Sequence, residues 1–352
     1  MAYTTIDDPS AYFQTALWTG DGTAGNAVTF DGNSDMQPDF VWSKKRNSAT
    51  SHILKDTSRG GTSDNDLHLV SDLTNAESTY AQYRMDFDSD GFTLDGVGDS
   101  GFQGIGTSMV SWAWKANAGT TASNTDGSIT STVQANTDAG FSIVTYGGTG
   151  SANTVGHGLA DTPDVIIFKN RSAANVWAVY HQGLGNNLKL VLNTSDAQDA
   201  DGAFMNGTLP TSSVFSVGAS VNTNGSGSNY VAYCFAEKQG YSKFGSYVGN
   251  GSADGTFVYT GFKPQWVMTK EIGAAGSWVI YDNKRDTFNP ETKLLSAETN
   301  GGESTFTQYD FVSNGFKFRT GGSENGANLT HIYMAFAENP STTSTGIPTT
   351  AR

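Results

Sequence analysis

The stretch "YVAYCFAEK", Tyr230–Lys238, has a near twin about a hundred residues later, "IYMAFAEN", at Ile332–Asn339. A third and more divergent version, "MVSWAWKAN", stands at Met109–Asn117. Recurrence at a regular spacing is the signature of an internal repeat. The three stretches therefore predict that one structural unit occurs three times and ends each time on the same strand.

The alternation within the middle stretch indicates how that strand packs. Every second residue is bulky and the residues between are small, in the order Val231, Ala232, Tyr233, Cys234, Phe235 and Ala236. Successive side chains of a strand point to opposite faces. One face is therefore bulky and the other small, as expected for a strand packed between two layers or against a neighbouring backbone.

Further landmarks align with these endings. Each unit has an apolar run that opens with a proline and ends with a lysine six residues later. The prolines are Pro38, Pro163 and Pro264, and the lysines are Lys44, Lys169 and Lys270. Eight residues beyond each lysine stand His52, Trp177 and Trp278, and the closing aromatic residues are Trp114, Phe235 and Phe336.

The landmarks divide the chain into parts. We expect an N-terminal arm (1–12), a first β-repeat (13–116), a linker (117–139), a second β-repeat (140–238), a third β-repeat (239–338) and a C-terminal tail (339–352). The linker is assigned because its Gly, Ser, Thr, Asn and Ala residues offer little to bury.

The expected fold class is all-β. Apolar runs are short, rich in Val, Ile, Tyr, Phe and Trp, and bounded by turn-forming residues, which is typical of sandwiches and barrels. We predict three tandem sandwich or jelly-roll-like (lectin-like) repeats, because a unit of about 100 residues exceeds the ~40 residues of a propeller blade. The periodicity leaves open whether they form separate beads or close around a pseudo-threefold axis.

Composition excludes several function classes. The formal charge of −14 disfavours a nucleic-acid or anionic-membrane partner. No stretch approaches the ~20 apolar residues of a membrane span, and the N-terminal residues lack the pattern of a secretory signal. The single cysteine, Cys234, cannot form a disulfide within one chain and is interpreted as a small buried residue.

One stretch, "DFDSDGF", resembles the opening of a calcium-binding loop. Asp86, Asp88 and Asp90 precede Gly91 at the required spacing, but Val97 stands where a bidentate glutamate is needed. An Asp-Gly hairpin turn explains the same residues. The five histidines have no metal-like spacing, so we predict neither a zinc site nor a cofactor.

Two sets of charged residues stand at matching positions of the repeats and are candidates for chemistry. Asp56 with Arg59, and Asp282 with Arg285, could be carboxylates activated beside a guanidinium, but solvent-facing ion pairs are the simpler interpretation. The lysines Lys44, Lys169 and Lys270 are candidates for surface binding, although a lysine that ends an apolar strand also protects a sheet edge.

No nucleophile elbow, phosphate loop or dinucleotide fingerprint occurs, so no catalytic residue is predicted. The tryptophans offer one binding hypothesis, because exposed aromatic faces beside polar loops can stack on sugars. Packing within the core is the alternative role for most of them. They are Trp18, Trp42, Trp112, Trp114, Trp177, Trp266 and Trp278.

Several segments resemble the repeated parts of β-rich virion structural proteins of marine tailed bacteriophages, including those of cyanobacteria. The segments are "DDPSAYFQTALWTGDG", "DGNSDMQPDFVW", "GSITSTVQANTDAGFSIVTY", "YVAYCFAEKQGYSKFGSYVGNGSADGTFVYTGFKPQWVMTK" and "IYMAFAENP". The resemblance implies a protein made in the host cytoplasm and assembled onto the virion. It carries over no catalytic residues.

Two functions from different classes follow. The first is a non-enzymatic virion component, either a tail or head fibre with an adhesin-like role or a capsid decoration protein. Its partners would be capsid, neck or tail proteins, further copies of itself and a host surface glycan. The alternative is a carbohydrate-active depolymerase or a glycan-binding module. For the first, the arm Met1–Pro9 is expected to anchor the protein and to be dispensable for folding.

Overall fold

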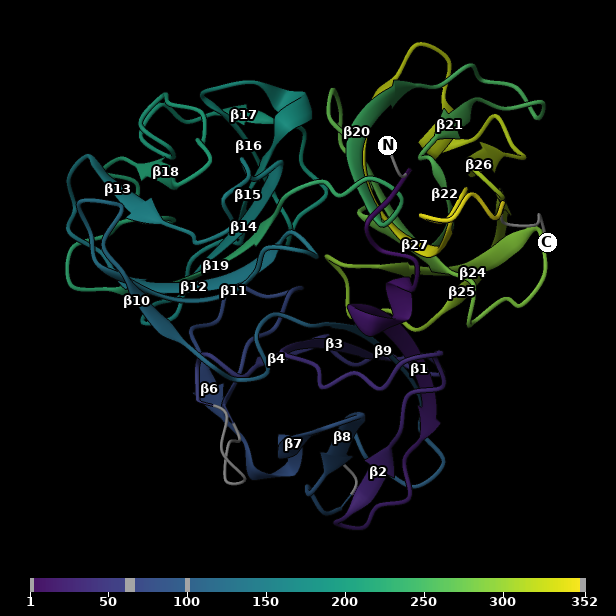
Figure 1. The fold of residues 1–352 in the computed structure, drawn as a ribbon, viewed down its shortest axis with the longest axis horizontal. Helices are drawn as coiled ribbons and strands as arrows, with labels where there is room; N and C mark the ends of the chain where they lie inside the picture. The colour runs from purple at the N-terminus through teal and green to yellow at the C-terminus, as the bar shows by residue number, and fades with distance from the viewer. Residues whose placement is uncertain (1–2, 61–66, 99–101, 349–352) are drawn as a thin grey trace.

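The structure is a computed structural model of the chain, and it describes residues 3–60, 67–98 and 102–348. Strands dominate these ranges, and the expectation of an all-β fold is confirmed. The helices found within them are short 3-10 turns: η1 (Pro9–Ala11), η2 (Ala81–Tyr83), η3 (Gln182–Leu184) and η4 (Ser323–Asn325). Figure 1 shows the strands gathered in three lobes around a common centre.

The first lobe holds β1 to β9. Its larger sheet has the order β1 (Phe13–Thr19), β9 (Ser108–Trp114), β3 (Phe40–Lys45) and β4 (Ile53–Asp56). Two smaller sheets complete the lobe. They are β2 (Asn26–Val28) with β8 (Gly91–Leu94) and β7 (Met85–Asp88), and β5 (Leu67–His68) with β6 (Ser78–Thr79).

The second lobe holds β10 to β19. Its larger sheet has the order β10 (Ala122–Asn124), β11 (Ser131–Asn136), β12 (Phe141–Gly147), β19 (Asn229–Phe235), β14 (Val165–Asn170), β15 (Ala178–His181), β16 (Leu188–Val191) and β17 (Asp199–Ala200). A two-stranded sheet completes it, formed by β13 (Asn153–Gly156) and β18 (Val214–Val217).

The third lobe holds β20 to β27 in one continuous sheet. The order is β20 (Ser242–Val248), β27 (Thr330–Pro340), β22 (Phe262–Glu271), β23 (Val279–Asp282), β24 (Glu291–Ser296), β25 (Ser304–Val312), β26 (Gly315–Phe318) and β21 (Phe257–Tyr259). The curved ribbon in Figure 1 brings β21 back toward β22, so the sheet is barrel-like.

One order of four strands occurs in each lobe: β1-β9-β3-β4, β12-β19-β14-β15 and β20-β27-β22-β23. In every case the strand that follows or contains the proline landmark pairs antiparallel with the closing strand. The closing aromatic residue faces an equivalent position each time, in the pairs Phe40 with Trp114, Val165 with Phe235, and Trp266 with Phe336.

The closing strands lie between two layers, as their alternating side chains predict. Bulky side chains enter a central apolar cluster that includes residues of all three lobes. Small ones enter a separate cluster inside each lobe. The aromatic residues Trp114, Phe235 and Phe336 contact one another at the centre, with ring centroids 6.2, 5.6 and 6.0 Å apart. Cys234 is buried on the small face, where burial raises the pKa of its thiol.

The expected linker, residues 117–139, is not a linker. It contains β10 and β11, and β11 pairs antiparallel with β12 from Thr132↔Thr145 to Asn136↔Phe141. Gln134 is completely buried there. The composition misled because the edge of β12 supplies the backbone hydrogen-bond partners, so this strand needs few large apolar side chains of its own.

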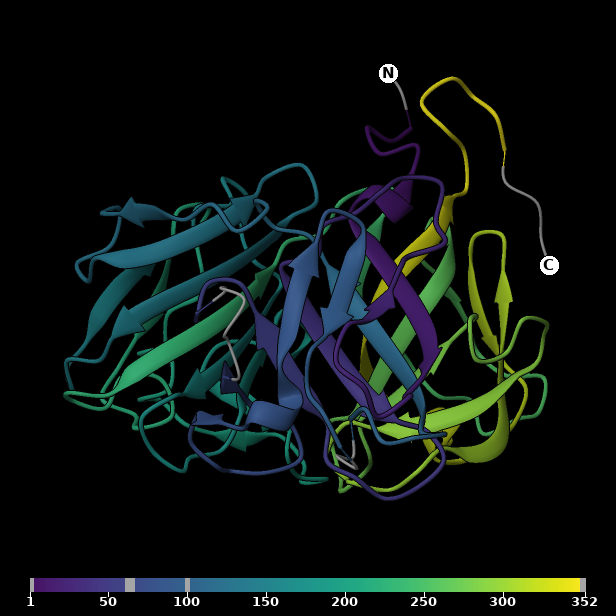
Figure 2. The ribbon, with the colours of Figure 1, turned by 90° about the horizontal axis from the view of Figure 1, so that it is seen from below.

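The N-terminal arm is packed, not free. Thr4 and Ile6 are buried, and the hydroxyl of Tyr3 donates to the carbonyl of Gly261 at 2.6 Å. The segment after β27 returns to the arm, where the backbone N–H of Ser344 donates to Asp7 at 2.6 Å. Figure 2 shows both segments on the same side of the molecule. Removing residues 1–9 would therefore uncover part of the third lobe.

Candidate functional site

The three landmark lysines are not on the surface. Lys44, Lys169 and Lys270 are at most 1% exposed, and each ammonium group donates to backbone carbonyl oxygens. One acceptor lies in the same lobe and the other lies in a different lobe. The acceptors in the other lobe are Asn300 for Lys44 (3.3 Å), Thr74 for Lys169 (2.8 Å) and Ser195 for Lys270 (3.3 Å). The hypothesis of surface binding by these lysines is therefore wrong.

The lysine contacts run in one rotational sense: first lobe to third, second to first, third to second. The landmark residues eight positions after the lysines make contacts between lobes in the same rotational sense. Trp177 donates to the Val70 carbonyl at 2.8 Å, Trp278 donates to that of Val191 at 2.9 Å, and the Nε2 atom of His52 lies 3.0 Å from that of Ser296. Residues at matching positions of the sequence units therefore bond across each of the three boundaries between lobes.

The buried lysines should resist chemical modification. Burial lowers the pKa of all three to about 8, but the amines are inaccessible in the folded protein. We expect an amine-reactive ester at pH 8 to label Lys317, whose side chain is 36% exposed, and to spare the landmark lysines until the protein is unfolded. Peptide mass spectrometry measures this, and early labelling of any of the three would contradict the assignment.

The two aspartate–arginine pairs are buried, so their interpretation as solvent-facing ion pairs is also wrong. Arg59 Nε lies 2.5 Å from Asp56, and Arg285 Nε lies 2.6 Å from Asp282, with side chains at most 1% exposed. Asp56 also accepts from the hydroxyl of Tyr233 in the second lobe at 2.6 Å. These carboxylates are held by structural bonds at lobe boundaries and face no cleft.

The supposed calcium loop is a hairpin turn. Strands β7 and β8 pair Asp88 opposite Gly91, which leaves a two-residue turn. Asp88 accepts from Thr93, and Asp90 accepts from the backbone of Met36. Gly91 has a φ of 100°, and a Cβ there would collide with the Val28 carbonyl. No cluster of three or more potential metal ligands occurs in the described ranges, so Asp86, Asp88 and Asp90 do not converge on an ion.

Two buried histidines make stability depend on pH. Burial lowers the pKa of His52 to about 3 and that of His181 to about 4. In the unfolded chain both bind a proton near pH 6.5. The unfolded state therefore binds more protons between these values, and this contribution to the free energy of unfolding is lost as the pH falls from about 6.5 toward 3.

We expect urea denaturation to give a lower midpoint at pH 5 than at pH 7. The variant His52→Gln keeps a donor for the Ser296 carbonyl and cannot titrate, so its midpoint should fall less over the same range. An equal fall in both proteins would show that His52 is not responsible.

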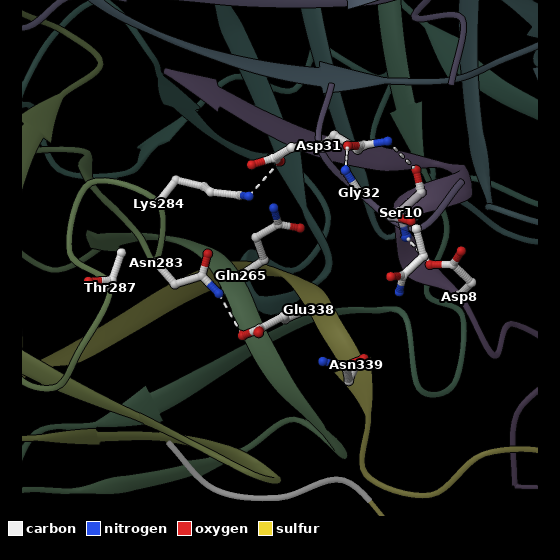
Figure 3. Close-up of a pocket in the computed structure, with 12 residues that line it drawn as sticks. Asp8, Ser10, Asp31, Gly32, Gln265, Asn283, Lys284, Thr287, Glu338 and Asn339 are labelled. Atoms are coloured by element: carbon white, nitrogen blue, oxygen red, sulfur yellow. Dashed lines mark hydrogen bonds and ion pairs between the residues drawn. The ribbon is translucent and has the colours of Figure 1, made fainter. Parts of the chain in front are cut away.

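The candidate functional site is a polar cleft of about 280 Å³ between the first and third lobes (Figure 3). Side chains from η1, β1 and the loop after β2 form one wall. Strands β22 and β27 and the segment after β23 form the other. The lining residues are Asp8, Ser10, Gln14, Asp31, Gly32, Asn33, Gln265, Asn283, Lys284, Thr287, Glu338 and Asn339.

Internal hydrogen bonds fix the wall from the first lobe. Asp8 accepts from the backbone and hydroxyl of Ser10, at 3.0 and 2.6 Å, and from the hydroxyl of Ser34 at 2.6 Å. Gln14 donates to the carbonyls of Ser10 and Ser34 and accepts from the backbone of Gly32. This wall is therefore preformed and needs no ligand to order it.

Charged side chains of the third lobe complete the cleft. Lys284 reaches across it to Asp31 at 2.6 Å, and the side chain of Lys284 is partly exposed while that of Asp31 is exposed. Glu338 accepts from Lys263 at 3.1 Å and from Asn283 at 2.6 Å. Because exposed ion pairs contribute little to stability, the Lys284–Asp31 contact can open at small cost.

Gln265 is the unusual residue of the cleft. It sits at a bulge in β22, where the pairing with β27 shifts between Pro264↔Ala337 and Trp266↔Phe336. Bulges redirect side chains and often lie beside functional sites. The residue is only 7% exposed, and its amide has no hydrogen bond within the part of the chain that the structure describes. Figure 3 shows this amide pointing toward Asp31 and Lys284.

The lining offers amides, carboxylates, hydroxyls and one ammonium group, and it contains no histidine, cysteine or aromatic ring. It therefore suits recognition of a polar ligand through hydrogen bonds and offers no activated nucleophile. The cleft could not be found from the sequence, because its walls come from residues 8–33 and 265–339 and meet only when the third lobe packs against the first.

Comparison with known proteins adds a family and no function. The model of the family described as a domain of unknown function, DUF7483, matches residues 8–340. No curated protein matches the chain significantly, and neither does any solved structure. Within the described residues, none of the helices has the length and apolar character that a membrane crossing requires.

Proposed function

The chain belongs to the DUF7483 family, and for this member of it we propose a non-enzymatic structural role in the particle of a tailed bacteriophage. The protein would be exposed on the particle as a head or tail fibre component with an adhesin-like role, or as a capsid decoration protein. The sequence resemblance to virion proteins of marine phages suggested this role. The arrangement of the recurring residues supports it further.

We propose that the three lobes are copies of one sandwich-like unit of about 100 residues, related by a pseudo-threefold axis. The common strand order supports this, as do the equivalent contacts between lobes. Backbone hydrogen bonds repeat in the same sense, from Asn175 to Thr74, Gly276 to Ser195 and Thr50 to Asn300. A unit related to its neighbours in this way buries its recurring residues at the boundaries.

The main support for the proposal is that the recurring residues make their contacts within the protein. The lysines and the two aspartate–arginine pairs are the groups that sequence alone would nominate for chemistry, and the closing aromatic residues recur beside them. They bond to one another or to backbone groups of neighbouring lobes. A rigid body joined through one core suits a part that must keep its shape on a particle.

Purified particles test this role. The protein should remain with particles of the encoding phage through density-gradient centrifugation and a high-salt wash, at a constant ratio to the major capsid protein by quantitative mass spectrometry. A host enzyme released by lysis serves as the control for contamination. Loss of the protein at the same step as that enzyme would contradict a structural role.

The polar cleft favours one further candidate, a glycan-binding module or depolymerase acting on host surface polysaccharide. A depolymerase would release reducing ends from such a polysaccharide at a rate proportional to protein concentration. Under the structural proposal, purified protein releases none.

A further inference from the structure

We propose that the cleft between the first and third lobes is a binding site for an uncharged saccharide that carries an acetamido group, held through the amide of Gln265. This deepens the proposed function, because it gives a particle-exposed protein a chemical class of host partner. It rests on that function only for the source of the ligand. Binding itself is a property of the isolated protein.

The first argument is the unpaired amide. Most buried polar groups in proteins are paired, whereas Gln265 is 7% exposed and its side chain makes no hydrogen bond among the described residues. The positions that match Gln265 in the other lobes are paired. Asp39 accepts from the backbone of Ala116 and Gly119, both at 2.7 Å, and Asp164 accepts from that of Glu237 at 2.7 Å. Gln265 makes no such hydrogen bond among the described residues, because β27 continues beyond the bulge and pairs with β22 as far as Phe262↔Pro340.

The second argument concerns the polar socket that Asp39, Thr57 and Ser58 form in the first lobe. A side-chain amide of the same chain occupies this socket. The side chain of Gln134, on β11, donates to Asp39 at 3.0 Å. It accepts from the hydroxyls of Thr57 at 2.8 Å and Ser58 at 3.0 Å. A carboxamide is therefore the group that this socket holds.

In the corresponding socket of the third lobe, no side chain of the described residues hydrogen-bonds to Gln265. The residues that match Asp39, Thr57 and Ser58 are Gln265, Asn283 and Lys284, and all three line the cleft. No counterpart of β11 pairs with β1, whose one sheet partner is β9 in the described structure. In the described structure, no strand equivalent to β11 fills the space between the third and first lobes, and the Lys284–Asp31 ion pair crosses it.

The chemistry of the lining selects the ligand. Asp8, Asp31 and Glu338 outnumber the single lysine, which disfavours an anionic ligand. Carboxylates accept hydrogen bonds through two oxygens, and side-chain amides both accept and donate, which matches neighbouring sugar hydroxyls. An acetamido group offers the same donor and acceptor as the side chain of Gln134. The volume of about 280 Å³ is just below the range of ~300–1,000 Å³ for ligand pockets and suits one or two sugar rings.

Saturation-transfer NMR with N,N′-diacetylchitobiose tests the proposal, with cellobiose as the control that has hydroxyls in place of acetamido groups. We expect transfer to the acetyl methyl protons and at least tenfold less transfer to cellobiose. Gln265→Leu keeps a similar volume without the amide and should abolish the signal. Thr287→Trp fills the cleft from an exposed position and should do the same. Asn186→Ala, on the second lobe, should leave it unchanged.

No transfer to diacetylchitobiose, equal transfer to cellobiose, or transfer that survives both cleft variants would each overturn the proposal. Circular dichroism confirms that the variants are folded. Incorporation of the Thr287→Trp protein into particles is measured separately. Failure of the saccharide proposal can therefore be told apart from failure of the structural one.

Discussion

Replacing Trp114 with alanine is expected to lower the free energy of unfolding by about 3–5 kcal/mol, the range for loss of a large buried aromatic side chain. The indole is 2% exposed and contacts aromatic rings of all three lobes. Its partners include Phe40 at 5.3 Å, Phe235 at 6.2 Å and Phe336 at 5.6 Å between centroids. The cavity would therefore open where the lobes meet.

Urea denaturation followed by circular dichroism measures this, with Phe288→Ala as the control. Phe288 is 80% exposed, so its loss should change stability by less than about 0.5 kcal/mol. Because one core joins the lobes, the native protein should unfold in a single transition. A Trp114→Ala protein as stable as the control, or three separate transitions, would contradict the shared core.

Replacing Arg59 with leucine is expected to cost about 3–5 kcal/mol, because it leaves a charged partner buried without compensation. Burial alone would lower the pKa of Arg59, but Asp56, Tyr233 and Glu77 raise it above its usual value. The guanidinium also lies 2.7 Å from Glu77 and donates to the Leu54 carbonyl at 3.0 Å. The arginine therefore joins β4 to the segment around Glu77 in the first lobe, and Asp56 and Glu77 in turn bond to Tyr233 and Arg171 of the second lobe.

The second lobe supplies a matched control. It has His181 and Leu184 where the first lobe has Asp56 and Arg59. The double variant Asp56→His, Arg59→Leu should recover part of the stability lost in the single variant, because it removes the stranded carboxylate. The exposed pair of Lys317 with Asp254 gives the opposite control, since Lys317→Ala should cost less than about 1 kcal/mol. A single variant no worse than Lys317→Ala would contradict the buried pair.

The sequence was sufficient for the strands that recur. Alternation in the closing strands predicted their place between two layers, and Trp114, Phe235 and Phe336 meet at the centre. Sequence could not show that Lys44 and its counterparts are buried. A lysine that ends an apolar strand is exposed in an isolated sheet, and only a neighbouring lobe supplies the carbonyl oxygens that receive it. Short-range patterns carry no information on such partners.

Two further features depended on context that composition does not contain. The segment 117–139 looked like a linker, yet the free edge of β12 recruits β11 from it. The cleft depends on a bulge at Gln265 and on the missing counterpart of β11 beside β1. One is a local irregularity and the other is an absence, and neither leaves a periodic signal in the sequence.

Imaging the phage particle tests the central claim most directly. Under the proposed structural role, a cryo-electron microscopy reconstruction of a phage that encodes this protein should contain density on the exterior of the head, neck or tail into which the three-lobed body fits as one rigid unit. Absence of such density from particles that are otherwise complete and infectious would contradict the structural role.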